Sequence, residues 1–175
     1  SQWVNDLPEW DGHPRVENFF DLYLTGKRSD EQREWMRRCS SYLFTAMIAR
    51  MLCVEGSQVD ISLVLQGSQG QRKSTLTRIL AGTDARYQEL NFGASYKDRA
   101  QDLEGKTVVE VGEMAGMRKR DVEEIKSFLT AREDKFRAPY EAEPSTHVRR
   151  CVFILTTNDS EVLRDPTGNR RFAVV

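Results

Sequence analysis

The fold is decided by Ile61-Ser-Leu-Val-Leu-Gln-Gly67-Ser-Gln-Gly70-Gln-Arg-Lys73-Ser74-Thr75. This run begins with a short β-rich segment, Ile61 to Leu65, continues through a glycine-rich loop and enters a helix expected over Ser74 to Ala81. Strand, glycine-rich loop and helix in this order are the context that a phosphate-binding loop requires. The sequence therefore predicts a nucleoside triphosphate site at the end of the strand.

Each part of the loop has a chemical task. Gly67 permits the turn out of the strand, and Gly70 lets backbone N–H groups approach the phosphates, where a helix N-terminus also favours an anion. Lys73 is expected to reach the β and γ phosphates of ATP, and the Ser74 hydroxyl to ligate Mg²⁺. The expected nucleotide-binding set is Gly67, Ser68, Gln69, Gly70, Gln71, Arg72, Lys73, Ser74 and Thr75.

Arg72 stands where the motif asks for glycine. Glycine is used there because the backbone passes close to phosphate and can need torsions that are costly for other residues. The arginine charge offsets part of that loss or weakens binding outright. A poorly hydrolysing site and an accidental turn before a surface helix are therefore the alternatives to an intact loop.

The composition is that of a globular chain with almost no net charge. Its 175 residues carry a net charge of −1, and 39% are hydrophobic, which is ordinary for a soluble domain. No apolar run is long enough for a membrane span, and the three widely spaced cysteines predict reduced thiols in a cytoplasmic protein. The chain starts without Met and stops on an apolar run, which predicts a domain of a longer protein. Any DNA contact must come from a local basic patch.

The spacing of apolar residues divides the chain into two parts. Helices are expected over Val16 to Leu24 and from Ser29 or Asp30 to about Cys53, which predicts a helical subdomain at 1–56. The remaining segment, 57–175, alternates strands with helices and predicts an α/β sheet with parallel elements. Its further expected elements are the strand Thr107 to Val111, the helix Asp121 to Thr130 and the strands Lys135 to Tyr140, His147 to Thr156 and Phe172 to Val175.

Two carboxylates follow the second expected strand. Glu110 and Glu113 lie at its end, where a carboxylate can hold Mg²⁺ through water and polarise the attacking water. Residues three apart on an ideal strand face opposite ways, so both reach one site only if Gly112 breaks the strand. The alternative is one surface glutamate and one structural glutamate.

Two later segments complete the candidate site. Asn158 ends the buried strand that starts at Cys151, and there it could hydrogen-bond the γ-phosphate or the lytic water; taken alone it is a turn residue. Arg170 and Arg171 follow a second turn, and either could act on a neighbouring subunit's nucleotide as an arginine finger. The alternative for this pair is a solvated surface.

Taken together, these motifs resemble the virulence-associated protein E family. The resemblance rests on Leu7 to Gly12, the phosphate loop, Glu110-Val-Gly-Glu113-Met, Lys126 to Thr130, Asp134 to Tyr140, Thr156-Thr-Asn158 and Leu163 to Phe172. These are phage and mobile-element proteins similar to superfamily 3 helicases of the AAA+ class. The resemblance implies a P-loop NTPase core preceded by a helical subdomain, with ATP and Mg²⁺ as ligands.

The same resemblance assigns roles to individual residues. It makes Lys73 and Ser74 the Walker A pair, Glu110 and Glu113 the Walker B acids with Glu113 activating water, and Asn158 the sensor. It also implies a pore-lining hairpin at about Lys135 to Val148. There Lys135, Arg137 and Tyr140 combine charge for phosphates with an aromatic ring for stacking; a charged hairpin face with a core tyrosine is the alternative.

The expected function is an ATP-driven DNA helicase or translocase of phage or mobile-element replication. It would act on single-stranded DNA as a homo-oligomeric ring such as a hexamer, with Arg170 or Arg171 as the finger. Two other classes stay open. One is a nucleotide- or DNA-binding regulatory module with weak or no hydrolysis, and the other is a small-molecule kinase, which would need an acceptor site and a lid.

Overall fold

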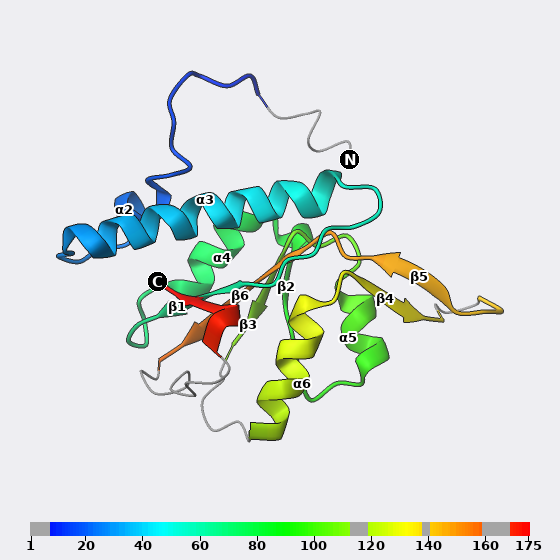
Figure 1. Cartoon of the computed structure of the whole chain (residues 1–175). Coiled ribbons are helices and arrows are strands. Elements are labelled where there is room, and N and C mark those ends of the chain that lie inside the picture. Colours follow the sequence, from blue (N-terminus) through cyan, green and yellow to red (C-terminus); the bar gives the residue numbers. More distant parts are fainter. Residues whose placement is uncertain (1–7, 113–118, 138–140, 159–168) are drawn as a thin grey trace.

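A five-stranded parallel sheet forms the centre of the computed structural model, which describes residues 8–112, 119–137, 141–158 and 169–175 (Figure 1). The sheet has the order β2-β3-β6-β1-β7. Its strands are β1 (Ser62–Gln66), β2 (Tyr87–Glu89), β3 (Val108–Val111), β6 (Val152–Thr157) and β7 (Phe172–Val174). The helices are α2 (Phe19–Tyr23), α3 (Asp30–Leu52), α4 (Lys73–Ala81), α5 (Tyr96–Asp102) and α6 (Lys119–Thr130), with short 3₁₀ turns η1 (Asp84–Arg86) and η2 (Asn169–Arg171).

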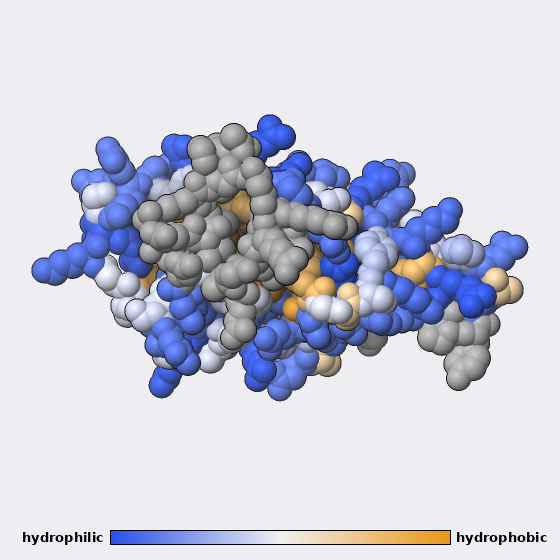
Figure 2. All heavy atoms as spheres, turned by 90° about the horizontal axis from the view of Figure 1, so that it is seen from below, coloured by the Kyte–Doolittle hydropathy of each residue, from blue (hydrophilic) through white to orange (hydrophobic). Residues whose placement is uncertain are grey.

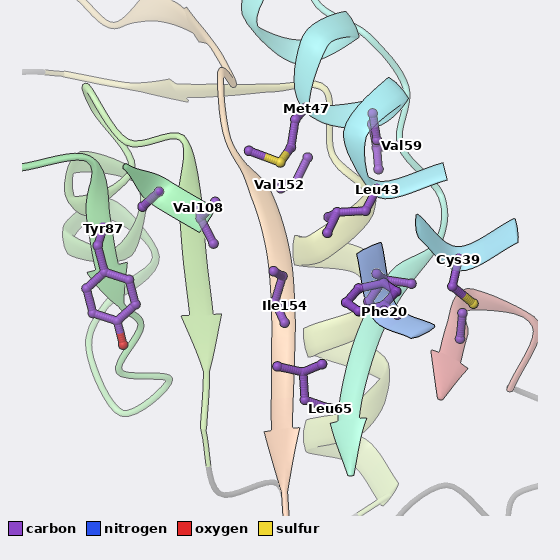
Figure 3. Close-up of a cluster of buried hydrophobic side chains, with 14 residues drawn as sticks. Phe20, Cys39, Leu43, Met47, Val59, Leu65, Tyr87, Val108, Val152 and Ile154 are labelled. Carbon is purple, nitrogen blue, oxygen red and sulfur yellow. The ribbon is translucent and has the colours of Figure 1, made fainter. Parts of the chain in front are cut away.

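The strands β3 and β6 are buried at every residue. Strands of parallel sheets read as continuous apolar runs because helices cover both faces of the sheet. On one face, side chains of α2, α3 and α4 pack against β1, β3 and β6 (Figure 3). On the other face, Ile125, Phe128 and Leu129 of α6 pack against Val109 of β3 and Phe153 of β6. The predicted α/β class with parallel strands is confirmed.

The long helix α3 is defined by its first turn and its buried stripe. Ser29 accepts a hydrogen bond from the Gln32 backbone N–H, and the Gln32 side chain accepts one from the Ser29 N–H, which is a capping box. Leu43 and Met47 then face the sheet in the same cluster as Leu65 and Ile154 (Figure 3). Truncating a side chain as buried as Leu43 typically costs about 2–5 kcal/mol.

This cluster joins the two predicted parts of the chain. Phe20 of α2 and Leu43 of α3 lie before residue 56, and Leu63 and Ile154 lie after it, yet all four belong to one core. The subdomain boundary at 1–56 and 57–175 stays a prediction. None of the helices in the described ranges combines the length and apolar character that crossing a membrane requires.

The strand predicted over His147 to Thr156 is wrong as a single element. It is divided into β5 (Ser145–Val148) and β6, which belong to different sheets. The break falls at Arg149 and Arg150, whose side chains leave the strand direction to bind carbonyls of α6 and of the end of α3.

Other predicted helix and strand boundaries differ from the structure because the local sequence signals for them are weak. The first helix covers five residues, Phe19–Tyr23, instead of Val16 to Leu24, since no side chain caps it at Asn18. The strand predicted over Lys135 to Tyr140 is β4 (Glu133–Phe136) within the described residues. The sequence analysis missed β2 and α5 because they are short and largely polar.

Candidate functional site

The carboxyl ends of β1, β2, β3 and β6 meet at one edge of the sheet, where parallel α/β proteins bind their ligands. A cavity of about 510 Å³ lies there. Its lining consists of Gln69, Gly70, Gln71, Arg72, Lys73, Ser74, Thr75, Glu89, Glu110, Gly112, Thr156, Thr157 and Asn158. The phosphate loop, the first of the two acids and the expected sensor therefore share one space.

Lys73 is held by three oxygen acceptors. Its Nζ donates to the carbonyls of Gly67 and Ser68, at 2.7 and 3.0 Å, and to Oδ1 of Asn158 at 2.7 Å. Lys73 is the first residue of α4 and Asn158 follows the last residue of β6. The ammonium group thus joins the loop to the neighbouring strand at the point where the N-terminus of α4 favours an anion.

Glu110 is the most heavily bonded group at this edge. Its side chain is 2% exposed. Oε1 accepts from Ser74 Oγ at 2.6 Å and from Thr156 Oγ1 at 2.8 Å. Oε2 accepts from Thr77 Oγ1 at 2.7 Å and from the Tyr87 hydroxyl at 2.6 Å. A buried carboxylate needs such partners, and here they come from α4, β2 and β6.

These contacts set the ionisation of the network. Burial pushes the pKa of Glu110 upward, but the four hydroxyl donors together outweigh it and leave the pKa below the usual 4.5. Burial and the hydrogen bond to Glu110 raise the pKa of Tyr87 to about 12. Glu110 is therefore an anion, and Tyr87 a neutral donor, near pH 7.

Arg72 adopts the left-handed conformation, with φ 58° and ψ 30°. It has the only positive φ among the non-glycine residues described. The left-handed region costs an L-residue roughly 1–2 kcal/mol because Cβ approaches the following carbonyl oxygen. The structure thus supplies the physical reason why glycine suits this position, and α4 begins directly after it.

A second cavity lies against the same loop. It has a volume of about 610 Å³ and shares Gln71, Arg72, Lys73 and Thr75 with the first. Its other walls are mainly apolar and come from α2 and the residues after it, α3, β1, α4 and the C-terminal end. They are Tyr23, Leu24, Thr25, Arg28, Met36, Leu65, Gln66, Leu76, Ile79 and Val175. The loop therefore separates a polar space from a largely apolar one.

The oxygen donors at the first cavity fit Mg²⁺ in kind. Ser74 Oγ and Glu110 Oε1 are hard oxygen ligands, which Mg²⁺ prefers. The described residues contain no group of three or more His, Cys, Asp or Glu that could hold a metal ion.

Two of the predicted catalytic residues do not lie at this edge, and a third cannot be placed. Arg170 and Arg171 form η2 just before β7, whose first residue, Phe172, pairs with Ser62 at the start of β1. Four strand steps separate Ser62 from Gln66, which is about 13 Å, so these arginines lie at the opposite end of the sheet. Glu113 lies outside the described residues.

Sequence reasoning missed Glu89, Tyr87 and Thr77. Tyr87 and Glu89 lie on the unpredicted strand β2, and Thr77 lies one turn into α4, where it binds Glu110. Alternation in Tyr87-Gln88-Glu89 is too short to identify a strand. The available signal was Thr77, which lies three residues beyond Ser74 and so on the same face of the helix.

The predicted hairpin is present as β4 and β5, an antiparallel pair that stands out from the body of the molecule (Figure 1). Lys135 and Arg137 are exposed on it, and Tyr140 lies outside the described residues. Seen from below, hydrophilic residues dominate the described surface at this end (Figure 2).

The root of the hairpin is a buried ion pair. Arg149 donates to Asp134 at 2.5 and 2.6 Å, both side chains are at most 2% exposed, and the Tyr96 hydroxyl donates to Asp134 at 2.6 Å. The Arg149 guanidinium also lies over the Phe128 ring of α6, 4.2 Å from its centre. The hairpin is thereby fixed to α5 and α6.

Comparison with solved structures shows a shared fold. An A-form apo structure of the NrS-1 C-terminal region (305–718) matches with a TM-score of 0.59 at 17% identity, covering 97% of this chain and 38% of that one. An apo structure of the same region matches with a TM-score of 0.57 at 17% identity, covering 91% and 36%. This chain thus spans less than two fifths of their length. No curated protein matches the sequence.

A family model covers nearly the entire chain and agrees with the resemblance seen in the motifs. The model is that of the virulence-associated protein E-like domain, and it matches residues 4–175. The chain belongs to the virulence-associated protein E-like domain family.

Proposed function

We propose that this chain is the P-loop ATPase core of an AAA+-like, superfamily 3 type DNA motor, a helicase or translocase of phage or mobile-element replication. The observation that carries the proposal is the meeting of Lys73, Ser74, Glu110 and Asn158 in one cavity. A lysine at a helix N-terminus, a hydroxyl on a buried carboxylate and an amide on the next strand are the parts that phosphoryl transfer requires.

In this proposal each side chain has a separate task on ATP. Lys73 exchanges the carbonyls of Gly67 and Ser68 for the β and γ phosphate oxygens, and the N-terminus of α4 adds its N–H groups. Asn158 orients the γ-phosphate or the attacking water. Ser74 would hold Mg²⁺, with Glu110 orienting its hydroxyl. The bound ion would neutralise charge that develops on the phosphates.

The second cavity is the proposed place for the base and ribose of ATP. It borders the phosphate cavity through Gln71 and Thr75, and its walls include Leu24, Ile79 and the aromatic ring of Tyr23. Nucleotide sites pair a polar phosphate region with an apolar pocket for the base. A nucleotide lying across the loop would therefore occupy both spaces.

The proposed DNA contact is the hairpin, and the proposed assembly is a ring such as a hexamer. With a net charge of −1, one chain has no general attraction for DNA, whereas a ring would gather one Lys135 and Arg137 pair from each subunit. Arg170 and Arg171 lie too far from their own cavity to act there, which suits a finger acting on a neighbour's nucleotide. We expect Arg171→Ala to preserve ATP binding and reduce the steady-state rate of the oligomer; an unchanged rate would exclude this role.

A second candidate function is favoured by one observation, the strained backbone of Arg72. A loop that needs a left-handed arginine could bind nucleotide weakly and hydrolyse it slowly or not at all. The chain would then be a nucleotide- or DNA-binding regulatory module.

ATP hydrolysis, measured with and without single-stranded DNA beside a Lys73→Ala control, tests the motor. We expect turnover that rises with DNA and falls at least about 100-fold in the variant, because Lys73 contributes charge stabilisation in the transition state. Turnover that ignores DNA would contradict the motor but keep the ATPase. Nucleotide binding without turnover would favour the regulatory module.

A further inference from the structure

Among the described residues, two carboxylates line the first cavity, those of Glu89 and Glu110, and their contacts differ. Glu89 ends β2 and pairs in register with Glu110 of β3. Glu110 is buried and accepts hydrogen bonds from four hydroxyls. Its two oxygens are therefore committed to orienting Ser74, Thr77, Tyr87 and Thr156, which leaves little capacity to accept a proton from water.

Glu89 is exposed at the cavity, and no residue in the described ranges gives its carboxylate a hydrogen bond or an ion pair. The carboxylate is directed across the end of β3. A Cβ placed on Gly112 would lie 3.6 Å from Glu89 Oε1 and 3.8 Å from Thr156 Oγ1. The absence of a side chain at Gly112 thus leaves open the space between Glu89 and the end of β6.

The contrast resembles other sites in which two carboxyl groups have separate tasks because their environments differ. Glu110 is held rigidly by its donors and positions a hydroxyl. Glu89 is exposed and lines the cavity, and no described residue bonds to its carboxylate oxygens. A general base must lie within hydrogen-bond reach of the proton it takes, and of these two carboxylates only Glu89 has an oxygen that no described residue occupies.

We propose that Glu89, in place of Glu113, which lies outside the described residues, is the catalytic residue that accepts the proton of the attacking water; this inference rests on the proposed ATP hydrolysis. The water oxygen forms a bond to the γ phosphorus, and the bond from that phosphorus to the β–γ bridging oxygen breaks. One water proton passes to the Glu89 carboxylate, and ADP leaves with the bridging oxygen. The proton is then released to solvent, so the products are ADP, inorganic phosphate and a proton.

The test compares wild type with Glu89→Gln and Glu89→Asp, using Glu55→Gln, another exposed glutamate, as a matched control. We expect Glu89→Gln to lower kcat at least about 100-fold, the usual contribution of general base catalysis, and Glu89→Asp to retain part of the rate. Affinity for a fluorescent non-hydrolysable ATP analogue and the melting temperature should stay unchanged. Glu55→Gln should behave as wild type.

A second readout does not depend on turnover. ADP with aluminium fluoride mimics the transferring phosphoryl group with a water in line, and transition-state mimics report interactions made in the transition state. We expect Glu89→Gln to bind ADP with aluminium fluoride at least about 10-fold more weakly while binding the ATP analogue normally. A merely structural role would move both affinities together.

The outcomes separate this inference from the proposed function. Wild-type turnover that disappears in Lys73→Ala but persists in Glu89→Gln overturns the role of Glu89, returns water activation to Glu113 and leaves the ATPase standing. A wild-type chain that neither binds nor hydrolyses ATP overturns both. Loss of turnover in Glu89→Gln together with loss of ATP-analogue binding or a lowered melting temperature also overturns the catalytic role.

Discussion

The cavity at the carboxyl ends of the strands and the β4–β5 hairpin are built in opposite ways. At the cavity, polar groups at its edge are bonded to one another, with Glu110 accepting from four hydroxyls and Lys73 donating to three oxygens. On the hairpin, Lys135 and Arg137 are exposed, and the buried ion pair lies at the root, between Asp134 and Arg149. The side chains at the cavity are thus held by one another, whereas the hairpin exposes charged side chains on strands that are fixed at their root.

Under the proposed function, this difference lets one small domain combine catalysis at the cavity with DNA binding at the hairpin. Transition-state stabilisation needs groups that do not reorganise during the reaction, and a dense network supplies them. Contacts to a DNA backbone depend on charge and tolerate motion of the side chains. The strand β6 connects the two regions, because Asn158 follows its carboxyl end and Arg149 precedes its amino end.

The root of the hairpin provides the largest expected effect on stability. Asp134→Ala leaves the Arg149 charge buried without its partner, and breaking such a pair typically costs about 3–5 kcal/mol. Urea unfolding of wild type and variant measures the change. Glu133→Ala is the control, since Glu133 is about half exposed and 3.8 Å from Arg132, and exposed pairs contribute about 0–1 kcal/mol. A loss below about 1 kcal/mol in Asp134→Ala would mean that the root is not rigid.

The second largest effect on stability is expected at the carboxylate of Glu110. Glu110→Gln replaces an anion that accepts four hydrogen bonds, and we expect a loss of about 2–3 kcal/mol near pH 7, since hydrogen bonds to charged groups contribute more than neutral ones. Glu89→Gln on the paired strand position should leave stability unchanged. Equal effects from both substitutions would remove the contrast between the buried and the exposed carboxylate.

The effect of Glu110 should also depend on pH. Its pKa is lowered in the folded state, so the charged form stabilises the fold above the ordinary value of 4.5, and this stabilisation is lost as the pH falls below 4.5 through the folded value. The stability difference between wild type and Glu110→Gln should therefore shrink between pH 5 and pH 3 in urea titrations. A difference that grows in that interval would contradict the assignment.

The structure explains which of these features a sequence can reveal. Gly67, Lys73 and Ser74 are adjacent in the chain, so their spacing alone predicts a phosphate loop, and the parallel sheet follows from the alternation of strands and helices. Asn158 and Glu110 were identified because each ends an apolar run. Glu89 was not, because the strand β2 that carries it has only three residues. The Asp134–Arg149 pair was not, because its two members are distant in the sequence and meet only through the break between β5 and β6.

Removing the exposed charges of the hairpin should weaken DNA binding without changing ATP hydrolysis in the absence of DNA. Lys135→Ala with Arg137→Ala should weaken binding to single-stranded DNA roughly 10-fold at low salt and reduce the slope of log K against log salt by about 1.4, or about 0.7 for each lost phosphate contact. Fluorescence anisotropy measures both quantities. Lys27→Ala, an exposed lysine between α2 and α3, serves as the control, and ATP hydrolysis without DNA should not change. Equal losses in the control would show a general charge effect.

The smallest expected change separates the two functions proposed for the cavity, and it concerns Arg72. Glycine would remove a left-handed strain of roughly 1–2 kcal/mol but add conformational freedom to the unfolded chain, which costs roughly 0.5–1 kcal/mol. We expect Arg72→Gly to be more stable by about 0.5–1 kcal/mol in urea unfolding. Arg72→Ala keeps the strained φ but removes the charge, so the two variants separate the effect of the backbone from that of the charge.

If ATP-analogue affinity rises a few-fold in the glycine variant and falls in the alanine variant, the loop is a working site whose backbone conformation is strained. If affinity falls equally in both, the guanidinium itself binds the nucleotide, and the departure from glycine is then an adaptation of the site instead of its decay.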